Sequence, residues 1–316
     1  MRNAIVLAAG KGTRMHSDLP KVVHKVGNMP MAEVIVRNLK QCGAERIVTV
    51  VGYGHEIVEH ALEGMCEFAL QEPQLGTGHA VMQAKALEKE TGATLVVNGD
   101  AATIQADTLA ALYDSVEHAD MAVLTVSLPD AASYGRVIRS ENGDVLKIVE
   151  FKDCTPEEAA VHEINTGIYA FRNEKLFEAL KELKNENAQH EYYITDLVEI
   201  FRNKGWRVTA VEAADQDEVQ GVNDCVELAR ANKWLNAHIN RKWMKAGVQY
   251  ADPDSTYVGP FVEMGHDVEL YPNVYLYGQT VLGNNVTVMP GAFLNNVTVC
   301  DGVTVKPGVY ENMEIK

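Results

Sequence analysis

The segment LAAGKGTRMHSDLPK, residues 7–21, joins a short apolar run to a stretch with helical spacing. It contains Gly10 and Gly12 together with the cations Arg14 and Lys21, in a chain of 316 residues whose formal net charge is −16. Glycine lets the backbone bend sharply and leaves its amides open to phosphate oxygens, and arginine can grip a phosphate with two nitrogens. A glycine-rich loop between a strand and a helix therefore predicts an anion site in a doubly wound α/β domain.

On either side of this loop, four short and almost continuously apolar runs are typical of strands buried on both faces. They are residues 4–7, 46–51, 94–97 and 121–126. Residues 31–42 carry apolar side chains on one helical face and end before Gly43, which favours a left-handed stop. Alternating strands and helices predict a doubly wound, mostly parallel sheet.

The pattern changes in the second half of this domain. The dipeptide Asn142-Gly143 predicts a hairpin turn within residues 136–149. Further predicted elements are strands at 163–171 and 207–211, helices at 174–183 and 194–203, and a long helix from 224 to about 246. We therefore expect a first domain over residues 1–228 and a linker helix over 229–250.

Residues 251–316 contain an internal repeat with a period of six. Small or β-branched residues recur at Thr256, Val262, Val268, Val274, Thr280, Val286 and Ala292, and then at Val297, Val303 and Val309 after a one-residue deletion. A hexapeptide repeat with intervening glycine, asparagine and proline predicts a parallel β-helix, here of about three coils. The fold class is therefore α/β followed by a short β-helix.

Composition limits the kinds of partner. The acidic balance repels polyanions at long range, so we expect no nucleic acid and no membrane surface as a partner. Five cysteines without C-x-x-C spacing favour reduced thiols, and the apolar start MRNAIVLAAG is too short for a signal segment. These features predict a cytoplasmic protein.

The glycine loop fits neither of two common phosphate motifs. A P-loop needs G-x-x-x-x-G-K-[ST], and a dinucleotide fingerprint needs a third glycine where this chain has Met15. The pattern L-A-A-G-x-G-T-R-M followed by L-P-K instead resembles the signature of the sugar-phosphate nucleotidylyltransferases. The form SDLPKVVH, residues 17–24, is similar to that of the N-acetylglucosamine-1-phosphate uridylyltransferases.

Further motifs of the same family follow in order along the chain. They are QEPQLGTGHA (71–80), NGD (98–100), YGR (134–136), VE (149–150), EINTG (163–167), NAQHEYYITD (187–196), GVN (221–223) and ADPDSTY (251–257). One local departure is Ala101-Ala102-Thr103, where the family commonly has a hydrophobic residue, proline and leucine; Asn98 also replaces a frequent aromatic residue. The missing proline is expected to loosen this turn.

This resemblance implies a reaction in which the phosphate of a sugar-1-phosphate attacks the α-phosphorus of UTP and pyrophosphate leaves. Catalysis of this kind depends on positioning and charge neutralisation. The resemblance assigns Arg14 and Lys21 to catalysis and Asp100 and Asn223 to one Mg²⁺. The implied substrate-binding residues are Leu7, Ala8, Ala9, Gly10, Gly12, Gln71, Gln74, Gly76 and Thr77 for the nucleotide, and Gly135, Glu150, Asn165 and Asn223 for the sugar and phosphates.

Two alternatives stay open at this point. The changes at Asn98 and Ala101-Ala102 allow a uridylyltransferase for another hexose-1-phosphate, and a non-catalytic regulatory or assembly homologue is the other reading. The resemblance also implies a left-handed β-helix and a homo-oligomer, a trimer in the family. Because the family's acetyl-CoA-dependent activity resides in later coils, we expect no acetyltransferase activity from these 316 residues.

Overall fold

The computed structural model describes residues 1–131, 134–141, 143–187 and 189–316. Two residues of predicted motifs, Asn142 in the hairpin turn and Ala188 in the 187–196 segment, lie outside this description. Contacts divide the chain into a first unit of residues 1–24 and 31–224 and a second unit of residues 25–30 and 225–316. None of the helices in the described ranges is both long enough and apolar enough to cross a lipid bilayer.

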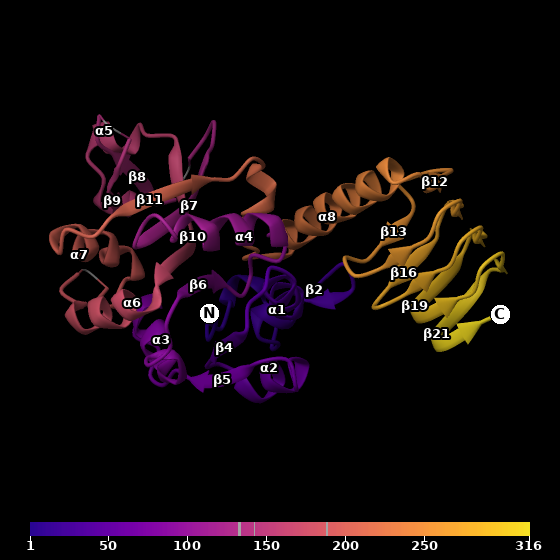
Figure 1. Ribbon diagram of the computed structural model, residues 1–316, viewed down its shortest axis with the longest axis horizontal. Coiled ribbons are helices and arrows are strands. Elements are labelled where there is room, and N and C mark those ends of the chain that lie inside the picture. The colour runs from indigo at the N-terminus through magenta and orange to yellow at the C-terminus, as the bar shows by residue number, and fades with distance from the viewer. Residues whose placement is uncertain (132–133, 142, 188) are drawn as a thin grey trace. The chain divides into compact units, whose positions relative to one another are not determined.

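A mixed sheet forms the centre of the first unit (Figure 1). Its strand order is β11-β7-β10-β6-β1-β4-β5, and the β8–β9 hairpin pairs with β10. Neighbours along this order are parallel except for β10, which is antiparallel to both β6 and β7. The strands are β1 (Arg2–Ala8), β4 (Arg46–Val51), β5 (Glu67–Leu70), β6 (Ala93–Asn98), β7 (Met121–Ser127), β8 (Arg136–Arg139), β9 (Val145–Val149), β10 (Glu163–Arg172) and β11 (Val208–Glu212). The mostly parallel sheet predicted from the sequence is confirmed.

Helices cover both faces of this sheet because its central strands are apolar on both sides. In β1, Ala4 and Val6 belong to one buried cluster and Ile5 belongs to the other. The first cluster contains α1 (Met31–Gln41), α2 (His55–Ala61) and α4 (Ala106–Ser115). The second contains α3 (Thr77–Gln83), α6 (Asn173–Ala179) and α7 (Leu197–Asn203). The remaining helices of the unit are short: α5 (Pro156–Ala159) and the 3-10 helices η1 (Thr13–Met15), η2 (Lys21–Val23), η3 (Lys85–Leu87), η4 (Phe151–Asp153), η5 (Leu180–Glu182), η6 (Ile194–Asp196) and η7 (Gln216–Glu218).

The strand order reverses at β1, which lies between β4 on one side and β6 on the other. A crevice opens at such a reversal, outside the carboxyl ends of the strands, and ligands of doubly wound folds bind there. The glycine loop follows the end of β1 at Ala8, and Asp100 follows the end of β6 at Asn98. The topology therefore brings these two segments to the same edge of the sheet.

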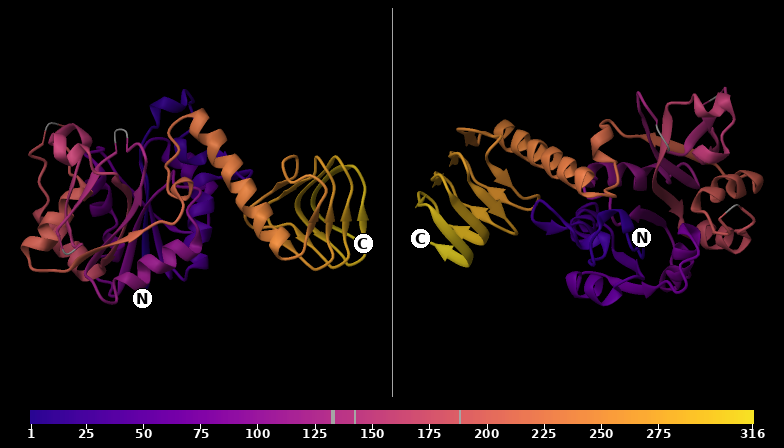
Figure 2. Two further views of the ribbon diagram at one scale, coloured as in Figure 1. Left: turned by 90° about the horizontal axis from the view of Figure 1, so that it is seen from above. Right: turned by 180° about the vertical axis from the view of Figure 1, so that it is seen from behind.

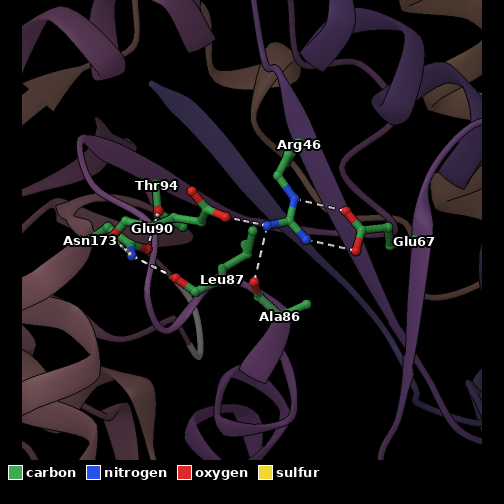
Figure 3. A network of polar contacts seen from close by, with 7 residues as sticks. All are labelled: Arg46, Glu67, Ala86, Leu87, Glu90, Thr94 and Asn173. Carbon is green, nitrogen blue, oxygen red and sulfur yellow. Dashed lines mark hydrogen bonds and ion pairs between the residues drawn. The ribbon is translucent and has the colours of Figure 1, made fainter.

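The opposite edge, at the amino ends of the strands, is held by a polar network (Figure 3). Arg46 grips both carboxylate oxygens of Glu67 at 3.0 and 2.9 Å and also pairs with Glu90. The fully buried Asn173 donates to the carbonyls of Leu87 and Glu90 at 2.8 and 2.7 Å, and accepts from the Thr94 hydroxyl at 2.6 Å. One side chain thus satisfies three polar groups inside the unit.

Replacing Asn173 should therefore be costly. We expect Asn173→Ala to lower the free energy of unfolding by about 3 kcal/mol, since buried carbonyls and a hydroxyl lose their partner. Urea denaturation followed by circular dichroism would measure this. Asn185→Ala is the matched control and should change little, because the Asn185 side chain donates a long, exposed hydrogen bond of 3.4 Å to the His190 carbonyl. Equal effects of the two substitutions would contradict the assigned role of Asn173.

In the second unit, the long helix α8 (Cys225–Lys245) is fastened by three asparagines spaced four residues apart. Asn232 accepts from the Gly27 amide at 3.0 Å, in the turn between β2 (Lys25–Val26) and β3 (Met29–Pro30). Asn236 and Asn240 both donate to the Thr256 carbonyl, at 3.0 and 2.9 Å. Four-residue spacing puts these side chains on one helix face. This face holds both the 25–30 hairpin and the first β-helix coil.

The rest of the second unit is a parallel coil of short strands, stacked one above another in Figure 2. Tyr257 pairs with Tyr275, 18 residues later, which is three hexads per coil. The hexad positions from Thr256 to Ala292 are at most 4% exposed, as expected for a core stripe. The strands are β12 (Gln249–Tyr250), β13 (Tyr257–Val258), β14 (Glu263–Met264), β15 (Glu269–Leu270), β16 (Tyr275–Tyr277), β17 (Val281–Leu282), β18 (Thr287–Val288), β19 (Ala292–Val299), β20 (Thr304–Val305) and β21 (Gly308–Ile315).

The predicted phase of the repeat is wrong at its end. Val309 was expected inside the coil, but it is 73% exposed. In the register of β19 and β21, Gly308 lies opposite the buried Ala292, and Val309 lies opposite Phe293. The turn at Pro307-Gly308 thus removes a second residue from the repeat. A one-residue shift moves a strand residue to the opposite face, so Val309 points outward.

Candidate active site

A cavity of about 360 Å³ lies at the carboxyl ends of β1 and β6. Its walls come from segments that are far apart in the sequence: the loop after β1, the 71–80 segment, the end of β6 and the 187–196 segment. The predicted site residues that line it are Leu7, Ala8, Ala9, Gly10, Lys21, Gln71, Gln74, Gly76, Thr77 and Asp100. The nucleotide and catalytic motifs therefore converge on one hollow.

The glycine loop approaches the cavity through close backbone packing. Gly12 has a φ of +66°, and a Cβ built on it would overlap the Lys21 side chain. Such a left-handed conformation favours glycine. Gly99 comes equally close to β1: its amide donates to the Leu7 carbonyl at 2.8 Å, and a Cβ would lie 2.9 Å from that oxygen. These contacts position Lys21 and Asp100 beside each other.

Lys21, Asp100 and Asn223 form the charged centre of the site. The Lys21 ammonium donates to Asp100 Oδ2 and, at 3.0 Å, to Asn223 Oδ1. The Lys21 and Asp100 side chains are only 16% and 15% exposed. Backbone packing holds the third member in place, because the Val222 amide donates to the Asp100 carbonyl at 3.1 Å. A Cβ on Gly221 would lie 3.2 Å from Asp100 Oδ1.

The oxygens of this cluster suit a magnesium ion. Asp100 and Asn223 both direct an oxygen at one cationic nitrogen, so their oxygens already converge on a single cation. Across residues 1–131, 134–141, 143–187 and 189–316 no group of three or more His, Cys, Asp or Glu side chains forms a metal site. Mg²⁺ is commonly bound by one or two protein oxygens, with water and substrate phosphates completing its shell. The residues present fit that pattern.

The two glutamines predicted to recognise the base also hold the backbone of the cavity. Gln71 is 5% exposed and donates to the Gly76 carbonyl at 3.0 Å. Gln74 donates to the Ala9 carbonyl, which also accepts from the Tyr53 amide at 3.0 Å. Thr77 accepts from the Ile194 amide at 3.2 Å, which joins the 71–80 segment to the 187–196 segment. Gln71 Nε2 also contacts His79 Nδ1 at 3.2 Å, which leaves the amide oxygen of Gln71 to meet a ligand.

Gly135, Glu150 and Asn165, the residues predicted to bind the sugar, lie close to one another and are not among the described residues that line the cavity. The backbone amide of Asn165 donates to the Gly135 carbonyl at 2.9 Å. A Cβ on Gly135 would lie 3.5 Å from Glu150 Oε2. Burial, and then the charge of Asp153, raise the pKa of the Glu150 carboxyl. Asn165 also donates to the Tyr169 hydroxyl at 2.7 Å. These contacts form a second polar cluster in the first unit.

Asn98 had no predicted role, and it lies beside Gly167, whose backbone amide donates to Asn165 Oδ1 at 3.1 Å. It lines the cavity from the end of β6, and a Cβ on Gly167 would lie 2.5 Å from Asn98 Nδ2. Glu191, Val22 and Ala80 also line the cavity without having been predicted. For Asn98 the available signal was its place at a strand end, two residues before Asp100. Arg14, in contrast, is exposed in η1 and stands outside the described residues that line the cavity.

The unusual run after Asp100 is held by hydrogen bonds despite its missing proline. Ala101 and Ala102 are 2% and 1% exposed. The Thr103 hydroxyl donates to the Glu218 carbonyl at 2.9 Å, and the Glu218 carboxylate accepts from the Gln105 amide at 3.1 Å. Side-chain hydrogen bonds therefore tie this turn to the 216–218 segment, and the loosening expected from the missing proline stays a prediction.

Comparison with known proteins agrees with this architecture. The Nucleotidyl transferase family model matches residues 3–247. The chain is 44% identical over 317 aligned residues to the bifunctional protein GlmU of Limosilactobacillus reuteri strain DSM 20016, covering 99% of this chain and 70% of the relative. It is 45% identical over 315 residues to GlmU of Exiguobacterium sibiricum, with the same coverage of 99% and 70%.

A solved structure adds evidence on the fold alone. A crystal structure from Bacillus anthracis, described as a glucose-1-phosphate thymidylyltransferase, superposes with a TM-score of 0.61 at 23% identity. The match covers 74% of this chain and 95% of that one. The family model, the relatives and the strand topology agree, and the chain belongs to the nucleotidyl transferase family as a GlmU-like member.

Proposed function

We propose that the protein is a Mg²⁺-dependent uridylyltransferase that converts UTP and N-acetylglucosamine-1-phosphate to UDP-N-acetylglucosamine and pyrophosphate. In this reaction an oxygen of the sugar phosphate forms a bond to the α-phosphorus of UTP. The bond from that phosphorus to the oxygen of the β-phosphate breaks, and pyrophosphate leaves with the electron pair. No protein nucleophile is required.

The observation that carries the proposal is the cluster of Lys21, Asp100 and Asn223 at a cavity built from a glycine loop. Two anions must be brought together in the reaction, so a site needs cationic charge and donors aimed at phosphate oxygens. Lys21 would supply charge to the developing phosphate oxygens, and the glycine amides would orient the triphosphate. Asp100 and Asn223 would hold Mg²⁺, whose charge, when bound, neutralises the phosphates.

The remaining walls of the cavity would supply specificity. Gln71 and Gln74 carry amides, which can offer both a donor and an acceptor to the imide edge of uracil. Gly76 and Thr77 would lie against the ribose. Glu150 would accept hydrogen bonds from the sugar hydroxyls, and Asn165 would lie near the 2-substituent of the sugar. Gly135 would let the sugar approach the backbone. Asn98 lines the cavity where the resembling family often has an aromatic residue, and this change makes another hexose-1-phosphate the second candidate substrate.

The test is pyrophosphate release with Mg²⁺ and UTP against a panel of sugars. The panel contains N-acetylglucosamine-1-phosphate, glucose-1-phosphate, galactose-1-phosphate, N-acetylgalactosamine-1-phosphate and a blank without sugar. We expect the first to be preferred. Preference for another sugar would support the same reaction with a different sugar-1-phosphate as substrate. If a folded sample that binds UTP released no pyrophosphate with any sugar, a non-catalytic role would be favoured.

Gly12 offers a prediction about the loop itself. Gly12→Ala should lower kcat for pyrophosphate release by about a hundredfold, because the added Cβ displaces Lys21 and small misplacements at a reacting centre are costly. Gly64→Ala is the matched control: Gly64 also has a left-handed φ, of +71°, but has open space around it. If both variants lose the same activity, backbone strain alone would explain the result and the contact with Lys21 would have no role.

A further inference from the structure

Lys21 occupies the place toward which the two oxygens proposed to bind the metal converge. Its ammonium contacts Asp100 Oδ2 and Asn223 Oδ1 at once, in a part of the site where both members of the ion pair are largely buried. An ammonium group and a hydrated Mg²⁺ ion cannot share these oxygens at hydrogen-bond distance. Two cations held a few ångströms apart also repel each other strongly when solvent is largely excluded.

The backbone of Lys21 is fixed, whereas the end of its side chain can move. The residue begins η2, and its Cβ packs against Gly12, so the main chain has little freedom. Beyond Cβ, a lysine has a flexible stem with several rotatable bonds. The cavity that Lys21 lines is the one in which a triphosphate would lie. The ammonium therefore has a second set of anionic oxygens within the reach of its own side chain once nucleotide is present.

We propose that Lys21 is a resident counter-cation that competes with the metal for Asp100 and Asn223. This inference rests on the proposed function. Without nucleotide, the lysine holds the two ligands together and keeps the affinity for a divalent ion low. When nucleotide phosphates enter, the ammonium transfers to them and the oxygens of Asp100 and Asn223 become available to the metal. Metal and nucleotide then bind cooperatively. The nucleotide draws the Lys21 ammonium away from Asp100 and Asn223, and the metal in turn frees the ammonium to contact the phosphates.

The first test measures Mn²⁺ binding to nucleotide-free protein by electron paramagnetic resonance of the free ion. Lys21→Met keeps the stem and removes the charge. If Lys21 occupies the ligands for 90% of the time or more, its removal should tighten Mn²⁺ binding by about tenfold or more. Lys11→Met is the control for the loss of a nearby positive charge, because Lys11 belongs to the same loop but lies over the Tyr53 ring at 5.0 Å.

The expected pattern is tight Mn²⁺ binding in Lys21→Met and an affinity within about twofold of wild type in Lys11→Met. An equal gain in both variants would overturn the proposal, since general charge would then account for it. Unchanged affinity in Lys21→Met would also overturn it. Asp100→Ala combined with Lys21→Met should lose the tight binding, which assigns the signal to this site.

A second measurement uses the wild-type protein, so it does not depend on how a variant folds. Acetylation of lysines by a water-soluble reagent is followed residue by residue by mass spectrometry, with and without saturating Mg²⁺ and without nucleotide. We expect Mg²⁺ to raise the acetylation rate of Lys21 several-fold while that of Lys11 stays constant. A rate of Lys21 that does not respond to Mg²⁺ would contradict displacement.

Failure of the competition by Lys21 and failure of the proposed enzyme function would give different results. If wild-type protein transfers uridylyl groups but Lys21→Met binds Mn²⁺ no more tightly, the competition fails and the enzyme assignment stands. If the competition is found but no sugar-1-phosphate supports turnover, the cluster is a metal site in a protein with another activity. Mn²⁺ binding thus tests the competition by Lys21, and turnover tests the uridylyltransferase activity.

Discussion

Asp100→Ala is expected to lower kcat by about a thousandfold, because charge neutralisation by a metal contributes several kcal/mol in the transition state. Asp100 supplies the carboxylate of the proposed metal pair, and the Asn223 amide oxygen alone carries no net charge. The substitution should leave the fold intact. The Asp100 side chain is 15% exposed at the rim of the sheet, and the Val222 amide bonds to its backbone carbonyl, which alanine retains.

The measurement is pyrophosphate release as a function of Mg²⁺ concentration, with circular dichroism to check folding. Asp107→Ala is the control, because Asp107 is an exposed aspartate in α4. A Mg²⁺-dependent rate close to wild type in Asp100→Ala would refute the assignment of this residue. Loss of rate in Asp107→Ala to the same degree would indicate a general effect on folding.

Lys21→Ala is expected to lower kcat by about a hundredfold or more, with a smaller change in KM. A donor aimed at charge that develops in the transition state typically contributes a factor of this size. The proposed competition adds a second signature: the slow variant should bind Mn²⁺ more tightly than wild type. A residue that only stabilised the fold would not produce both changes at once.

Steady-state kinetics of pyrophosphate release would test this, with Lys40→Ala as the control because Lys40 is exposed on α1. We expect the control to retain its kcat. Should Lys21→Ala retain its kcat as well, Lys21 would have no part in catalysis and the catalytic proposal would fail. Arg14 offers a comparison, since it is exposed in η1 and a smaller effect is expected from its replacement.

Much of the fold could be predicted because burial on both faces leaves a local signal. The run 46–51 is the strand β4 as predicted, and residues 31–42 form α1 to within one residue. The coil positions from Thr256 to Ala292 are buried as the hexad repeat predicts. Val309 was misplaced because the repeat lost a residue at Pro307-Gly308, and β-branched spacing alone does not reveal which turn is shorter.

The internal arrangement of the site could not be derived in the same way. Lys21 and Asp100 were predicted for separate roles, and nothing local in the sequence shows that they pair across 79 residues. The role of Asn98 depends on its contact with Gly167, which only the pairing of β6 and β10 brings about. The grouping of residues 25–30 with α8 depends on one hydrogen bond from Gly27 to Asn232 and on similar long-range contacts.

Phosphorus NMR of the products formed from UTP and N-acetylglucosamine-1-phosphate with Mg²⁺ would test the proposed reaction directly. We expect the UTP signals to disappear while the signals of the pyrophosphate diester of UDP-N-acetylglucosamine and of free pyrophosphate appear in equal amounts, and we expect omission of Mg²⁺ to prevent this. UTP that stays intact, or UTP hydrolysed to UMP and pyrophosphate without sugar in the product, would contradict it.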